Sequence, residues 1–176
     1  LPICWNEGGG FGRWLKELGM RNFLIHGILS AALGVSEPAA AASTVATPQL
    51  NARIVSEQAV VRPGETLTLA LDQRMAASWH TYWRNPGDSG QAPKINWHLP
   101  EGATAGPLQW PTPDRVPFGP LVNYGYSERA VLLTEIRVPA GWPAGTAFPV
   151  AADAELLVCQ QICIPVDAKF RLEIPT

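Results

Sequence analysis

Two cysteines, Cys159 and Cys163, stand four positions apart near the end of the chain, in the stretch LLVCQQICIP. Paired thiols at this spacing suit three kinds of chemistry: a structural disulfide, a metal site, or a reversible disulfide that exchanges with other thiols. A disulfide that closes a loop of about five residues removes only about 2 kcal/mol of unfolded-chain entropy. A purely structural bond is therefore poorly placed here, although it stays open as an alternative.

A metal site would need further ligands beside the two thiolates. His80 or His98 could complete a site for copper(I) or zinc, which accept sulfur and imidazole ligands. The sequence offers no second close cysteine pair, and Met75 is the only methionine after the N-terminal segment. A closed site with four ligands is therefore difficult to assemble, and the sequence predicts no resident metal or cofactor.

A redox pair needs a loop that exposes the sulfurs and surroundings that shield them. LLVC is typical of an incoming strand, QQI of a tight connection and CIPVDAKFRLEI of an outgoing strand, so the sulfurs are expected at a hairpin tip. Gln160 and Gln161 are neutral, and no Lys, Arg or His adjoins either cysteine. The sequence therefore predicts no strongly lowered thiol pKa, and CxxxC in a β-rich chain differs from the thioredoxin motif.

The elements that must position this pair are β-strands. From Ala52 onward, Pro and Gly recur every ten residues or so, and stretches such as TLTLALD alternate apolar with polar residues. Seven or eight short antiparallel strands over about 130 residues predict an all-β sandwich. We expect the large indole side chains in its core. They belong to Trp79, Trp83, Trp97, Trp110 and Trp142.

Two segments of this chain are predicted to be loops, residues 85–93 and residues 111–128. The second is about eighteen residues long, and a loop of that length in a compact domain is usually a lid, a binding loop or disordered. Its aromatic residues Phe118, Tyr124 and Tyr126 argue against disorder. We therefore expect it to cover or bind something.

The N-terminal residues 1–42 differ in composition from the rest and are expected to contain an upstream segment and a secretory signal peptide that starts at Met20. Arg21 supplies the positive charge, residues 23–35 the apolar region, and the alanines before Ser43 the cleavage signal. The apolar region is shorter than the roughly 20 residues that span a bilayer. A short amphipathic helix is the rival interpretation of the first residues.

Removal of this leader would leave residues 43–176 as one exported domain with a single cysteine pair, in a compartment where disulfides persist. The formal net charge of -2 and the pI near 5.9 come with scattered rather than clustered Lys and Arg residues. A nucleic-acid partner is therefore not expected.

Three stretches, WHTYWRNPGDSG, GPLVNYGY and LVCQQICIP, occur in this order. Through them, residues 45–175 resemble the N-terminal periplasmic domain of DsbD-type thiol:disulfide interchange proteins, most closely the branch linked to suppression of copper sensitivity. The resemblance implies an immunoglobulin-like sandwich and a thiol:disulfide oxidoreductase without a cofactor. It also implies transient partners: a membrane-embedded reductase domain that supplies electrons and exported thioredoxin-like proteins that receive them. Membrane contact is expected only through such a partner or a further C-terminal part.

The resemblance also assigns residues to the site. Cys159 and Cys163 match the redox pair, with Cys163 in the place of the cysteine that forms mixed disulfides. The closer spacing of the two cysteines is a departure from the better-known members, which leaves the geometry and potential of the disulfide open.

The family's shielding cap loop would fall within residues 118–126, where Asn123 and Tyr124 are the nearest matches and Phe118 is a substitute for the shielding ring. His80 and Tyr82 lie on one face of a strand, where the family places polar aromatics beside the cysteines. His80 stands where better-known members have tyrosine, and it is either a proton carrier or a surface histidine.

Two functions of other classes remain as alternatives to the redox domain. One is a non-enzymatic immunoglobulin-like binding module with a structural disulfide. The other is a copper-binding periplasmic domain, which would bind copper(I) through the same cysteines.

Overall fold

The computed structural model describes residues 42–176, and over this range the chain forms strands and no helix. The predicted signal segment lies outside the described residues except for Ala42, which begins the first strand. The eleven strands of the described range are β1 (Ala42–Ala46), β2 (Leu50–Ser56), β3 (Thr66–Met75), β4 (His80–Gly87), β5 (Lys94–His98), β6 (Thr104–Ala105), β7 (Asp114–Phe118), β8 (Leu121–Ser127), β9 (Arg129–Arg137), β10 (Phe148–Cys159) and β11 (Cys163–Ile174).

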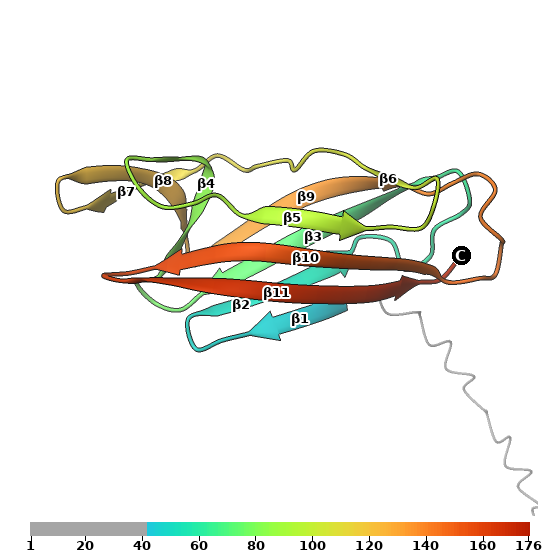
Figure 1. Cartoon of the computed structure of the whole chain (residues 1–176), viewed down its shortest axis with the longest axis horizontal. Coiled ribbons are helices and arrows are strands. Elements are labelled where there is room, and N and C mark those ends of the chain that lie inside the picture. The colour runs from blue at the N-terminus through green and yellow to red at the C-terminus, as the bar shows by residue number, and fades with distance from the viewer. Residues whose placement is uncertain (1–41) are drawn as a thin grey trace, which may run out of the picture. The chain divides into compact units, whose positions relative to one another are not determined.

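These strands form two antiparallel sheets, so the predicted all-β, immunoglobulin-like sandwich is confirmed (Figure 1). The five-stranded sheet has the order β1-β2-β3-β9-β6, and the six-stranded sheet has the order β11-β10-β4-β8-β7 with β5 added beside β10. One edge of β10 is shared by two strands: β5 pairs with Ala151–Glu155, and β4 reaches the same edge at Cys159. The end of β10 is thereby held against the start of β4.

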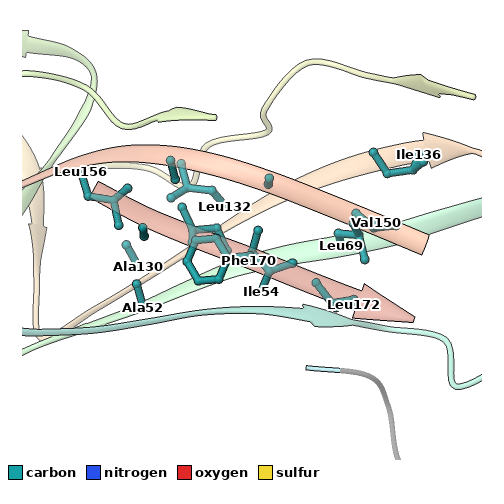
Figure 2. Close-up of a cluster of buried hydrophobic side chains, with 14 of the residues drawn as sticks. Ala52, Ile54, Leu69, Ala130, Leu132, Ile136, Val150, Leu156, Phe170 and Leu172 are labelled. Carbon is teal, nitrogen blue, oxygen red and sulfur yellow. The ribbon is translucent and has the colours of Figure 1, made fainter. Parts of the chain in front are cut away.

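The core lies between the sheets and consists mainly of aliphatic side chains at alternate strand positions. Figure 2 shows Phe170 of β11 among Ile54 of β2 and Leu132 of β9, and all three are essentially without solvent contact. The five tryptophans that we expected in the core are only partly buried and pack at its margin. The inward positions carry Ala, Val, Leu and Ile instead, which fill the narrow space between two close sheets without the width of an indole.

The segment predicted as one long loop, residues 111–128, contains a β-hairpin made of β7 and β8. Its prolines obscured the strand pattern. Pro117 is tolerated because β7 is an edge strand, whose outer side needs no ladder hydrogen bond. Gly119, with φ +58°, supports the tight turn between Phe118 and Leu121.

Two hairpin tips project from the same end of the sandwich in Figure 1, the β10–β11 tip that carries the cysteines and the β7–β8 tip. They stand apart from one another in this view. No helix within residues 42–176 is long and apolar enough to cross a membrane.

Candidate active site

The two cysteines form a disulfide with an Sγ–Sγ distance of 2.08 Å and a Cα–Cα distance of 4.1 Å. The bond closes the three-residue turn of the β10–β11 hairpin, in which Cys159 and Cys163 are the last register pair. The Gln160 N–H donates a hydrogen bond of 2.9 Å to the Ile162 carbonyl across this turn. The predicted strand, tight connection and strand are therefore confirmed.

The two sides of the disulfide differ in exposure. Cys159 retains only 1% of its accessible surface, whereas Cys163 is exposed. Ile162, directly before Cys163, is 67% exposed. A thiol of another protein can therefore approach Cys163, while Cys159 is enclosed by its own domain.

Strand β4 brings two polar aromatic side chains to the disulfide. His80 is the register partner of Cys159, and paired residues of antiparallel strands point to the same face of the sheet. Tyr82 follows two positions later on that face. Its hydroxyl lies 3.3 Å from His80 Nε2 and 3.9 Å from Cys163 Sγ. The structure thus brings together four predicted site residues, Cys159, Cys163, His80 and Tyr82.

Both aromatic residues are buried, with 6% of the surface of His80 and 2% of that of Tyr82 exposed. The interpretation of His80 as a surface histidine is therefore wrong. Burial lowers the pKa of the His80 imidazole and raises the pKa of the Tyr82 phenol, since each charged form would lose its hydration. Both groups are consequently neutral near pH 7, and the disulfide borders an uncharged polar surface.

The loop between β4 and β5 covers Tyr82. A Cβ atom at Gly90 would lie 2.1 Å from Tyr82 Cε1, so the loop backbone touches the ring, and the φ of +89° at Gly90 also favours glycine. Asn123 Oδ1 on β8 accepts hydrogen bonds from Ser89 N (2.9 Å) and Ser89 Oγ (3.1 Å). Asp88 exchanges two hydrogen bonds with the Val122 backbone, which pins the same loop to β8.

The predicted cap residues lie in two different places. Asn123 is 1% exposed and holds the β4–β5 loop over Tyr82. Phe118 and Tyr124, 40% and 39% exposed, belong to the β7–β8 hairpin, whose tip stands apart from the β10–β11 tip in Figure 1. The cover that the structure shows next to the disulfide is the β4–β5 loop, residues 88–93, whose Gly90 backbone lies against the Tyr82 ring. A covering role for Phe118 stays a prediction.

Sequence reasoning predicted a loop over residues 85–93, of which residues 85–87 belong to β4, and it did not assign Ser89 or Gly90 to the site. The signal was the glycine itself, since glycine in a short loop often marks a close backbone approach. Which ring it would approach depends on the β4–β8 pairing, which the loop sequence does not encode.

The second histidine considered as a metal ligand lies elsewhere. His98 pairs in register with Ala151 and hydrogen bonds to Asp153 at 2.9 Å. Ala151 precedes Cys159 by eight strand positions, which is about 26 Å along an extended chain. His98 therefore does not join the cysteine pair, and in the part of the chain that the structure describes no three His, Cys, Asp or Glu side chains gather into a potential metal site.

Comparisons with known proteins agree with this geometry. The family model described as "Thiol:disulfide interchange protein DsbD, N-terminal" matches residues 51–175. The N-terminal periplasmic domain of ScsB from Proteus mirabilis superposes with a TM-score of 0.61 and 22% identity, over 77% of this chain and 52% of that one. The chain thus spans about half the length of that structure, and at this identity the likeness shows a shared fold.

Two further structures are more distant. The reduced DsbD N-terminal domain of Neisseria meningitidis has a TM-score of 0.42 and 12% identity, over 78% of this chain and 86% of that chain. The yeast GGA1 GAE domain has a TM-score of 0.43 and 12% identity, over 77% and 99%. No curated protein sequence matches the chain.

Proposed function

The chain belongs to the family of the N-terminal domain of the thiol:disulfide interchange protein DsbD, and we propose that it is a periplasmic relay domain for thiol-disulfide exchange. Its cysteine pair receives electrons from a membrane-embedded reductase domain and passes them to exported thioredoxin-like proteins. The observation that carries this proposal is the asymmetric disulfide at a hairpin tip, with Cys163 exposed and Cys159 enclosed. A bond with this placement is accessible to partner proteins and contributes little as a staple.

In the reducing half of the cycle, a thiolate of the donor attacks Cys163 Sγ, and the electron pair of the broken Sγ–Sγ bond moves to Cys159. A second donor thiol resolves the mixed disulfide and leaves both cysteines reduced. In the other half, the Cys163 thiolate attacks a disulfide of the acceptor, and Cys159 resolves the new mixed disulfide. Two electrons are transferred in each half, and no cofactor takes part.

The position of Cys159 suits the resolving role. Because it is 1% exposed and directly opposite Cys163 in register, it meets the mixed disulfide from inside the domain. An external thiol reaches it less easily than it reaches Cys163. Exchange that proceeds through Cys163 therefore avoids trapping the domain in a mixed disulfide with its buried cysteine.

Two observations of different kinds support the proposed periplasmic location. The ScsB domain of the same fold is a periplasmic domain, and residues 1–42 have the composition of a secretory leader. An oxidising compartment also allows a disulfide to persist between encounters with the donor.

The experiment that tests the proposal combines trapping with a measured potential. With Cys159→Ser, Cys163 is expected to form a stable mixed disulfide with an oxidised thioredoxin-like protein, whereas Cys163→Ser is expected to form little. The wild-type domain is equilibrated in graded dithiol buffers, and trapping of its free thiols is expected to give a potential above about -300 mV. Circular dichroism is expected to show an intact fold in both states. A lower potential, or unfolding on reduction, would contradict the proposal and favour a binding module with a structural disulfide.

A further inference from the structure

An exchange cycle moves protons as well as electrons, because only the thiolate form of Cys163 is a nucleophile. The turn residues next to it, Gln161 and Ile162, carry no charge that could stabilise a thiolate. The Tyr82 hydroxyl lies 3.9 Å from Cys163 Sγ. It is therefore placed to accept the thiol proton.

His80 can take up the proton through the Tyr82 hydroxyl. Tyr82 Oη lies between Cys163 Sγ and His80 Nε2, 3.9 Å from the sulfur and 3.3 Å from the nitrogen. The His80 and Tyr82 rings meet edge to face, with centroids 5.2 Å apart and planes at 76°. The imidazole and the phenol are buried, and Cys163 is exposed, so this row of polar groups opens to solvent at the sulfur end.

We propose that Tyr82 and His80 form a proton path that activates Cys163, a step that rests on the exchange function proposed above. In the reduced domain the Cys163 thiol proton passes to Tyr82 Oη as the hydroxyl proton of Tyr82 passes to His80 Nε2. The products are a Cys163 thiolate, a neutral tyrosine and an imidazolium. The thiolate attacks one sulfur of the acceptor's disulfide, that bond breaks, and the leaving thiolate of the acceptor takes up a proton from the imidazolium through solvent.

The environment of His80 suits a proton acceptor. Tyr82 faces it from its own strand and Cys159 from β10, and its register partner on β8, Ser127, carries no charge. Burial lowers the pKa of His80, so the imidazole is unprotonated before the transfer, and the same burial disfavours the imidazolium until a thiolate forms beside it. Once the thiolate has formed, the two opposite charges stabilise one another, as in other thiolate–imidazolium pairs.

Tyr82 is the residue of this pair that touches a reacting atom, and His80 acts through it as a positioning residue and proton acceptor. The placement of the Tyr82 hydroxyl depends on the cover above its ring, where the Gly90 backbone lies against the ring. Asn123 fixes that cover through Ser89. Pairing of β4 with β10 thus positions His80, and the β4–β5 loop positions Tyr82.

The test measures the ionisation of Cys163 in the reduced, folded domain. Alkylation by iodoacetamide is followed between pH 5 and 10, and mass spectrometry of the peptides separates Cys163 from Cys159. In His80→Gln and in Tyr82→Phe, the Cys163 rate at pH 7 is expected to fall about tenfold and to recover at high pH, as expected for a rise of about one unit in the thiol pKa. His98→Gln, a histidine hydrogen bonded to Asp153 on another part of the sheet, serves as the matched control and is expected to change nothing.

An unchanged profile in His80→Gln overturns the path, and so does a change in Tyr82→Phe alone or an equal change in His98→Gln. Should His80→Gln fail to fold, His80→Tyr retains an aromatic ring without the base and is expected to give the same shift. Failure of the exchange function looks different: the wild-type disulfide would then resist dithiols or the domain would unfold on reduction, whatever the His80 variants show.

Discussion

Two buried polar clusters lie on the outer faces of the two sheets. One contains an ionised carboxylate, and the other consists of neutral groups. On the five-stranded sheet, the side chain of Asp72 is only 2% exposed, yet it is ionised among arginines. Arg53 Nη2 donates to it at 2.8 Å and Arg129 Nε at 2.7 Å, and Arg74 Nε lies 3.6 Å away. On the six-stranded sheet, Tyr82 and His80 beside the disulfide are equally enclosed but neutral.

The comparison shows which neighbours keep a buried carboxylate ionised in this domain. Asp72 receives cations from β2, β3 and β9, and these arginines retain contact with water. The disulfide face has hydrogen-bonding groups without a fixed counter-charge, so a thiolate there has to be formed and removed within each exchange. The Asp72 cluster therefore contributes to the stability of the fold, whereas Tyr82 and His80 serve the proton transfer proposed above.

The largest effect is expected from removing the charge at Asp72. Asp72→Asn should lower the free energy of unfolding by about 3 kcal/mol at pH 7, near the lower end for a broken buried ion pair because the arginines remain hydrated. Urea titrations monitored by tryptophan fluorescence measure this loss. Asp167→Asn, at an exposed position of β11, is the control and should stay within about 0.5 kcal/mol.

The same variant gives a test in acid. Burial by itself would raise the pKa of Asp72, but hydrogen bonds from Arg129 and Arg53, together with their charges, outweigh it and hold the pKa below its usual value. The carboxylate's contribution is therefore complete above about pH 4, its ordinary range, and declines as the pH falls toward the lowered pKa. The gap between wild type and Asp72→Asn should narrow below pH 4. A gap that is already small at pH 7 would mean that the two clusters differ less than the geometry indicates.

Sequence could predict the parts of the site that depend on neighbouring residues. The hairpin around Cys159 and Cys163 follows from strand alternation on both sides of a three-residue turn, and period two places His80 and Tyr82 on one face. The Asp72 cluster was not predicted, because it depends on the register of β2, β3 and β9, and residues 53, 72 and 129 are far apart in the chain. Contact of Gly90 with Tyr82 is missed for the same reason.

The second largest effect is expected in the β4–β5 loop, which covers Tyr82 in the uncharged cluster. Gly90→Ala adds a methyl group within the Tyr82 ring and strains a backbone at φ +89°, whereas Gly145→Ala strains a backbone at φ +78° with no atom within 4 Å of the new Cβ. Backbone strain should cost both variants about 1 kcal/mol, and overpacking should cost Gly90→Ala about 1 kcal/mol more, so that its whole loss stays below that of Asp72→Asn. Chemical denaturation of the pair isolates the contact. Equal losses would show that the loop does not hold the tyrosine in place.

The smallest effect is expected at the tip itself, where the uncharged cluster offers partners an apolar contact instead of an ion pair. Ile162 is 67% exposed beside Cys163, so Ile162→Ser should leave stability and reduction by dithiothreitol unchanged. Exchange with a thioredoxin-like protein should slow about fivefold, because burying part of an isoleucine in a transient interface is worth about 1 kcal/mol. Stopped-flow fluorescence during exchange measures both rates.

Val60→Ser provides the matched control for that rate. Val60 is 47% exposed, and the next residue, Val61, donates a backbone hydrogen bond to Pro175 just beyond the far end of β11. The length of β11, 12 residues or about 40 Å, therefore separates it from Cys163. If both serine variants slow protein exchange equally, the loss of an exposed apolar side chain far from Cys163 has the same effect as its loss at the tip, which contradicts docking there. If only Ile162→Ser slows it, apolar docking at the tip substitutes for the charge complementarity that the disulfide face lacks.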